Sequence, residues 1–107
     1  MAREKFQTLT EQMFYILLSL RQECCGTDIM TQVHSATGGR VSVGPGTLYN
    51  LLESFLTAGM IRETKVEGRK RSYLITEAGQ KARRDEYDRL MRLTADYEDV
   101  FFGKEDL

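Results

Sequence analysis

One stretch of the sequence decides the fold: Gly38-Gly39-Arg40-Val41-Ser42-Val43-Gly44-Pro45-Gly46-Thr47-Leu48-Tyr49. The two glycines at its start favour the end of a helix, because glycine adopts the left-handed backbone that terminates helices. Pro45 favours the first turn of a new helix, where its missing amide proton is not needed. The stretch therefore predicts a tight connection between two helices.

The helix that begins near Pro45 is predicted to be amphipathic and to end at Gly59. Its apolar stripe should face a core, and its other face carries small and hydroxylated side chains. The stripe comprises Leu48, Leu51, Leu52, Phe55 and Leu56, and the polar face comprises Thr47, Asn50, Glu53, Ser54 and Thr57.

Two further helices precede this stretch. The first is predicted from about Thr10, its N-cap, to Leu20, and it is apolar nearly all round. Cys24-Cys25-Gly26 interrupts the pattern. The second is predicted to begin near Thr27, its N-cap, and to end at Gly38-Gly39.

A β-hairpin is predicted next, with strands over Met60–Val66 and Arg69–Thr76 and a turn at Glu67-Gly68. Its tip carries three cations, Arg69-Lys70-Arg71. Three helices followed by a basic-tipped hairpin are the order of a winged helix-turn-helix, a mainly α (α+β) fold. Its third helix can enter a DNA major groove while the hairpin reaches the phosphate backbone.

A last helix is predicted from Thr76-Glu77 to about Phe102. Apolar side chains recur along it at intervals of three and four, and residues 1–76 already contain a core of their own. This seam therefore needs a partner, most simply a second copy of the chain. We expect a winged helix-turn-helix DNA-binding domain over residues 1–76 and a long C-terminal dimerisation helix with a short tail over 77–107.

Four blocks of the sequence, in order and at compatible spacing, resemble the PadR family of bacterial transcriptional regulators. They are the opening stretch, Gly59-Met60-Ile61, Gly68-Arg69-Lys70-Arg71-Ser72-Tyr73 and Thr76-Glu77-Ala78-Gly79. The resemblance covers roughly residues 8–80, and the single-helix tail resembles the smaller branch of the family.

The resemblance implies a homodimeric DNA-binding repressor that responds to a small aromatic or drug-like effector. The two-fold symmetry of a dimer predicts a pseudo-palindromic operator on double-stranded DNA. The residues expected to contact DNA are Ser42, Gly46, Thr47, Tyr49, Asn50, Lys65, Arg69, Lys70 and Arg71. Those expected at the dimer interface are Phe14, Leu17, Tyr87, Leu90, Met91, Thr94, Tyr97 and Phe101, and the expected effector pocket comprises Tyr87, Leu90, Met91 and Tyr97.

Charge and three departures from the family pattern leave an alternative open. The chain has 107 residues and a net charge of -1, although residues 40–76 are net +3 and residues 77–107 net -3. Glu53 and Ser54 stand where the family often has cations, and Gly26-Thr27 replaces a Gly-Tyr pair. The chain has no Trp, so a Trp-lined drug pore is not expected. The alternative is a winged-helix protein–protein interaction module with weak or lost DNA binding.

Other functions find little support. No phosphate loop, nucleophile elbow or paired-histidine motif is present, so we expect no enzyme and no cofactor. His34 is the single histidine and should be solvated, so we expect no metal site. Cys24 and Cys25 are interpreted as buried apolar residues rather than a redox switch. No apolar run could span a bilayer, and no secretory segment is recognised, which favours the cytoplasm.

Overall fold

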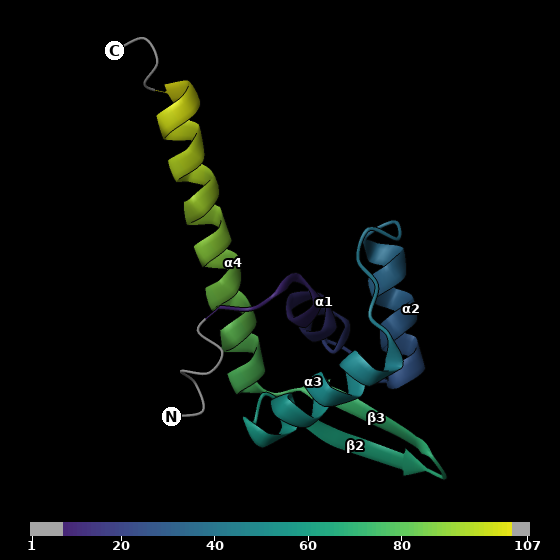
Figure 1. Cartoon of the computed structure of the whole chain (residues 1–107). Coiled ribbons are helices and arrows are strands. Elements are labelled where there is room, and N and C mark those ends of the chain that lie inside the picture. The colour runs from purple at the N-terminus through teal and green to yellow at the C-terminus, as the bar shows by residue number, and fades with distance from the viewer. Residues whose placement is uncertain (1–7, 104–107) are drawn as a thin grey trace.

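The computed structural model describes residues 8–103 and shows a winged helix-turn-helix from which one long helix projects (Figure 1). This confirms the predicted mainly α fold. The elements in chain order are α1 (Glu11–Ser19), β1 (Cys24–Cys25), α2 (Gly26–Ala36), α3 (Pro45–Thr57), β2 (Ile61–Glu67), β3 (Lys70–Ile75), α4 (Glu77–Glu98) and the π-helical turn η2 (Asp99–Gly103).

The helix caps agree with the sequence at two of three predicted positions. The Thr10 hydroxyl accepts a hydrogen bond from the Met13 amide, and the Thr76 hydroxyl accepts one from the Gly79 amide, both at 3.2 Å. The predicted Thr27 cap of α2 is wrong. This helix begins at Gly26 directly from the extended Cys25, which makes no side-chain cap.

The sheet is antiparallel with strand order β1-β3-β2. The β2–β3 hairpin, here called the wing, contains the predicted strands with a bulge between Glu63 and Lys65. Its turn lies at Gly68 and Arg69, so the prediction that Arg69 begins the second strand is wrong. The two-residue strand β1, whose Cys24 pairs with Tyr73, was not predicted.

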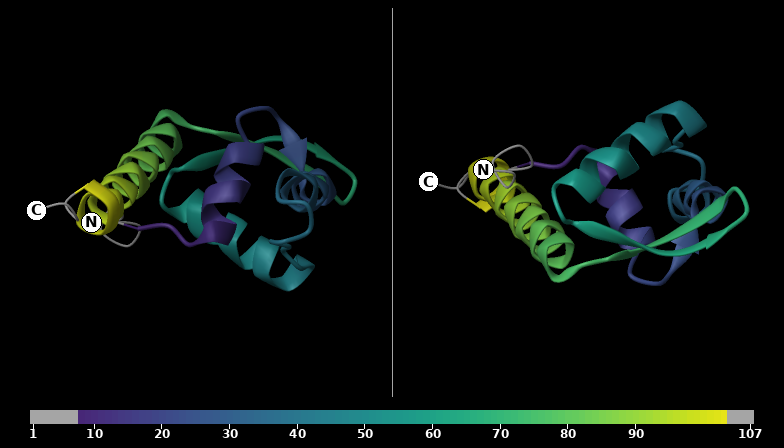
Figure 2. Two further views of the ribbon diagram at one scale, coloured as in Figure 1. Left: turned by 90° about the horizontal axis from the view of Figure 1, so that it is seen from above. Right: turned by 90° about the horizontal axis from the view of Figure 1, so that it is seen from below.

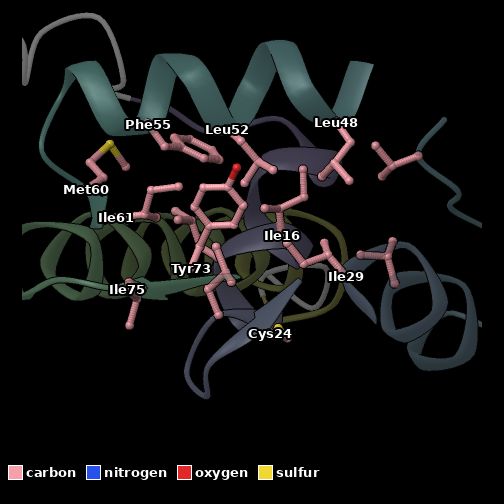
Figure 3. Close-up of a cluster of buried hydrophobic side chains, with 14 of the residues drawn as sticks. Ile16, Cys24, Ile29, Leu48, Leu52, Phe55, Met60, Ile61, Tyr73 and Ile75 are labelled. Carbon is pink, nitrogen blue, oxygen red and sulfur yellow. The ribbon is translucent and has the colours of Figure 1, made fainter. Parts of the chain in front are cut away.

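The core lies between α3, the sheet and the first two helices. From α3, Leu48, Leu52 and Phe55 point toward side chains of α1, α2 and the strands (Figure 3). Leu17 is fully buried in the same core. It is therefore not available to a second chain, and its assignment to the dimer interface is wrong. The reason is that α1 lies between α4 and α2 (Figure 2), so both of its apolar faces are covered within one chain.

The helix α4 has an inner and an outer part. Gly79, Ala82 and Glu86 are buried against the rest of the protein. A Cβ atom added at Gly79 would lie only 2.1 Å from the Met60 carbonyl oxygen, so the helix approaches the sheet closely at this residue. Residues 87–103, here called the outer segment, contain no buried residue. Their projection gives the molecule a longest dimension of 63 Å.

Candidate nucleic-acid interface

A cleft of about 440 Å³ joins α3 to the wing. Tyr49 contributes one wall from α3, and Arg69, Lys70 and Arg71 contribute the other. The start of α2 closes the cleft with Gly26 and Thr27, with Cys25 and Tyr73 also lining it. Two surfaces predicted separately from the sequence, the third helix and the basic hairpin tip, thus meet at one place.

Tyr49 is half-exposed, at 49%, and its position depends on a glycine. A Cβ atom added at Gly26 would lie 2.5 Å from the Tyr49 hydroxyl oxygen and 3.0 Å from the ring carbon Cζ. Only hydrogen fits between the start of α2 and this ring. Gly26-Thr27 differs from the family's Gly-Tyr pair at Thr27 alone, and the contact of Gly26 with Tyr49 was not predicted, because no spacing rule links residues so far apart in the sequence.

The other predicted residues of α3 lie on its solvent side. Thr47 and Asn50 are exposed, and a Cβ atom added at Gly46 would meet nothing within 4 Å. Pro45 is in the first turn of the helix, as predicted, and Gly44 is its N-cap. The beginning of α3 therefore presents an unobstructed, uncharged polar surface.

The loop before α3 is held against α1. The Gln12 side-chain amide donates to the Ser42 carbonyl oxygen at 3.0 Å. Arg40 pairs with the Glu11 carboxylate at 2.9 Å and donates to the Tyr15 hydroxyl at 3.2 Å. Ser42 itself is exposed. These contacts hold the loop that leads into α3 against α1, and the sequence did not predict this role for Arg40 or Gln12.

The cations of the wing differ in how they are paired. Arg71 forms an ion pair with Glu63 across the hairpin at 2.8 Å, and this carboxylate raises the pKa of Arg71. The Lys65 ammonium nitrogen lies 3.6 Å from a carboxylate oxygen of Glu67. Arg69 and Lys70 form no ion pair with any other described residue. The positive charge at the wing tip is therefore carried mainly by these two side chains.

The outer segment carries the exposed apolar side chains of α4. Tyr87, Leu90, Met91, Tyr97 and Phe101 are between 39% and 59% exposed. The Thr94 hydroxyl donates to the Leu90 carbonyl oxygen, so it is occupied within the helix. The rings of Tyr97 and Phe101 lie 4.8 Å apart, centroid to centroid. The predicted interface residues on α4 and η2 are thus exposed in the single chain, although Tyr87 also lines a pocket against α1.

The predicted effector pocket is only partly assembled. Phe14 is half-buried and lines a small pocket of about 230 Å³ between α1 and α4 together with Leu18, Arg83, Arg84 and Tyr87. Of the four predicted pocket residues, Tyr87 alone lines it. Leu90, Met91 and Tyr97 lie farther along α4 on its exposed surface.

The remaining candidates offer no reactive site. Both cysteines are buried and free, and burial, with Asp28 as the next cause, raises the pKa of Cys24 to about 11. Little Cys24 thiolate would therefore exist at neutral pH, which weakens the hypothesis that Cys24 is a redox switch. His34 is exposed. Residues 8–103 contain no group of three potential metal ligands, and none of their helices is long and apolar enough to cross a membrane.

Comparisons with known proteins agree with this architecture. A family model described as "Transcriptional regulator PadR-like family" matches residues 16–85. A transcriptional regulator from Clostridium thermocellum superimposes with a TM-score of 0.69 at 20% identity, over 86% of this chain and 92% of that one. A PadR-like transcription factor from Bacteroides fragilis gives 0.69 at 20% identity, over 83% and 87%. RosR of H. salinarum gives 0.62 at 21%, over 87% and 96%. A comparison with curated proteins gave no match.

Proposed function

This chain belongs to the PadR-like family of transcriptional regulators, and we propose that it acts as a ligand-responsive repressor that binds a pseudo-palindromic DNA operator as a homodimer. The family is one of regulators rather than enzymes. In this proposal residues 1–76 bind DNA and residues 77–107 hold two copies together. A repressor of this kind would act in the cytoplasm.

The observation that carries the proposal is the cleft that joins Tyr49 to the tip of the wing. A helix fits the major groove of B-DNA, and the side chains at its start can reach base edges. Thr47, Tyr49 and Asn50 would face the bases, with Ser42 and Gly46 beside them. The wing would then lie over the sugar-phosphate backbone, where Arg69 and Lys70 neutralise phosphates. Lys65 and Arg71 would add less, because each has a carboxylate close by.

The outer segment supports the proposed dimer. Its apolar side chains are exposed along the helix, and such a surface normally marks an interaction site. A second copy related by a two-fold axis would cover the same residues on both chains. Two α3 helices presented in this way would read half-sites about 34 Å apart, one turn of DNA.

The pocket between α1 and α4 is where we place the effector. Phe14, Leu18 and Tyr87 offer apolar contacts to a small aromatic or drug-like molecule. A molecule lodged there would act on the packing of α4 against α1. It would therefore change how the dimer holds its two DNA-binding units.

A second candidate function is a protein–protein module with weak or lost DNA binding. It is favoured by the acidic side chains around the wing. Glu63 neutralises Arg71, and Glu53 of α3 also acts electrostatically on Arg71. DNA binding in this case would depend on very few cations and would be abolished at modest salt.

The test is binding of the full chain to DNA from upstream of its own gene and to scrambled DNA, across a salt series. We expect tighter binding to the upstream DNA, a linear fall of log affinity with log salt, and a dimer by sedimentation. Asn50→Ala should lose about 1–3 kcal/mol of preference for the operator, because its amide can pair with adenine. Thr57→Ala, at the far end of α3, is the control and should change nothing. Equal, weak binding to both DNAs would favour the protein-contact function.

A further inference from the structure

A buried carboxylate connects α4 to the beginning of α1. Glu86 is 3% exposed and is the one charged residue buried among residues 8–103. Burying a carboxylate is unfavourable unless it is paired and hydrogen-bonded. Here Arg89 donates to both carboxylate oxygens and lowers the pKa of Glu86, and the Leu9 backbone amide donates to Oε1 at 3.0 Å. The carboxylate is therefore ionised and satisfied at neutral pH.

Of the two residues that donate to Glu86, Leu9 is significant because of where it lies in the chain. Leu9 is buried and immediately precedes Thr10, the N-cap of α1. The hydrogen bond thus ties the middle of α4 to the backbone at the point where α1 begins. We call Leu9, Glu86 and Arg89 the α1–α4 joint.

Glu86 is also the last buried residue of α4. Gly79, Ala82 and Glu86 lie on one face of the helix at intervals of three and four. Beyond Glu86, the outer segment has no buried residue. The part of α4 that packs closely on the rest of the protein therefore ends at Glu86, the outermost of its three buried residues, with only Tyr87 and the half-buried Arg89 adjoining it.

The outer segment acts as a lever on this joint. Its 17 residues, 87–103, extend for about 26 Å at about 1.5 Å per residue, so a tilt of about 10° at Glu86 would move its end by about 4–5 Å. The exposed apolar side chains lie on this lever, whereas the candidate DNA surface lies on the opposite side of the joint. A change of angle at the joint would therefore change the distance between two α3 helices in a dimer.

We propose that Glu86 is a positioning residue whose hydrogen bond to Leu9 sets the angle of α4 and thereby selects the half-site spacing that the dimer recognises. This inference rests on the proposed function, since it requires a dimer that reads two half-sites. It assigns no contact with DNA to Glu86. Its role is to hold the two DNA-binding units at the separation at which the second half-site increases the affinity of the dimer for DNA.

The experiment compares Glu86→Ala, Glu86→Gln and the control Asp88→Ala, which removes the same charge from an exposed position two residues away. Each protein is titrated with DNA holding one half-site, two half-sites at the native spacing, and two half-sites moved apart by one or two base pairs. Sedimentation reports the dimer. Amide hydrogen exchange at Leu9 reports the joint directly.

For Glu86→Ala we expect faster exchange at Leu9, an intact dimer and unchanged affinity for a single half-site. Affinity for the native spacing should fall by about tenfold, the effect of losing one hydrogen bond to a charged group, and the altered spacings should be better tolerated. Glu86→Gln retains an oxygen for the Leu9 amide and should lose less. Asp88→Ala should match the parent.

The inference is overturned if Glu86→Ala leaves the spacing preference unchanged, or if it weakens single-site and two-site binding equally. If Glu86→Ala does not fold, Glu86→Gln decides by the same criteria. A parent protein that gains nothing from a second half-site would overturn the proposed function and this inference together. If the parent binds DNA more tightly when a second half-site is present, but the variants keep its spacing preference, only this inference is overturned.

Discussion

The helix α3 and the outer segment of α4 are both amphipathic, but they differ in what covers their apolar faces. On α3, Leu48, Leu52 and Phe55 are at most 1% exposed, because α1, α2 and the sheet lie against them. On the outer segment, Leu90, the least exposed of the large apolar side chains, is still 39% exposed. A repeating apolar pattern therefore shows that a face will be covered, but does not show whether the same chain covers it.

Removing one aromatic ring from each region should have opposite effects on folding and on self-association. Phe55→Ala should lower the free energy of unfolding by about 3–5 kcal/mol, because it opens a cavity in a closed core. Phe101→Ala should leave the unfolding of the monomer unchanged and weaken only self-association. Urea unfolding at several protein concentrations measures both effects.

The control for this pair is the concentration dependence. Only Phe101→Ala should change how the unfolding midpoint depends on protein concentration. A loss of monomer stability with Phe101→Ala would show that the outer segment packs on its own chain, and the contrast between the two helices would disappear.

A second prediction tests how closely the covered, inner part of α4 packs on the sheet. Gly79→Ala should destabilise the protein by about 1–3 kcal/mol, because the new Cβ would meet the Met60 carbonyl oxygen and Ile75 Cγ1. This is opposite to the gain of about 1 kcal/mol that alanine usually gives inside a helix. Thermal unfolding measures the difference.

The matched control is Gly46→Ala in the first turn of α3, where the added Cβ would meet nothing within 4 Å. It should leave the midpoint of unfolding unchanged or raise it slightly. If Gly79→Ala is as stable as the parent, the inner part of α4 does not pack closely on the sheet.

The parts of the fold that the sequence predicted are those with local signals. Pro45 and the flanking glycines marked the start of α3, and the hydroxyl caps Thr10 and Thr76 marked two more helices. The alternation around Glu67-Gly68 indicated the hairpin. Each of these signals involves residues close together in the sequence, where backbone preferences act.

The parts that were missed depend on contacts between distant residues. The strand β1 has two residues, too few to show a period, and exists because Cys24 pairs with Tyr73. Glu86 has no local signal in the sequence, and its burial is explained by hydrogen bonds from Leu9 and Arg89. Leu17 was assigned to the dimer interface from the resemblance to the family, although its own chain covers it.

A third prediction concerns the exposed face of α3, where the Tyr49 ring lies against Gly26 of α2. Gly26→Ala should displace the Tyr49 ring and weaken operator binding by about fivefold, since an off-rotamer side chain costs about 0.5–1.5 kcal/mol. Thermal stability should change little, because a half-exposed ring can move toward solvent. DNA titration and thermal unfolding, run in parallel, separate the two effects.

The test of this prediction is a double-mutant cycle. Gly26→Ala is measured in the parent and in Tyr49→Ser, which lacks the ring that the new methyl group meets. If Gly26 acts only through Tyr49, the substitution should have no effect on DNA affinity in the second background. An equal loss in both backgrounds would show that Gly26 serves α2 instead.

The smallest expected effect concerns the wing. There, we expect a cation to contribute to DNA binding only if no carboxylate of the protein is paired with it. Arg69→Ala removes a cation that no described carboxylate pairs, so it should weaken DNA binding by about threefold per subunit at moderate salt and reduce the salt slope by about one unit per lost phosphate contact. The matched variant removes Arg71 together with Glu63, an ion pair whose atoms lie 2.8 Å apart. Because the two charges of this pair nearly cancel at the distance of a DNA phosphate, the double variant should keep the salt slope of the parent. A slope reduced as much as in Arg69→Ala would mean that Arg71 leaves Glu63 to bind DNA, and that pairing in the free protein does not determine which cations of the wing contribute to binding.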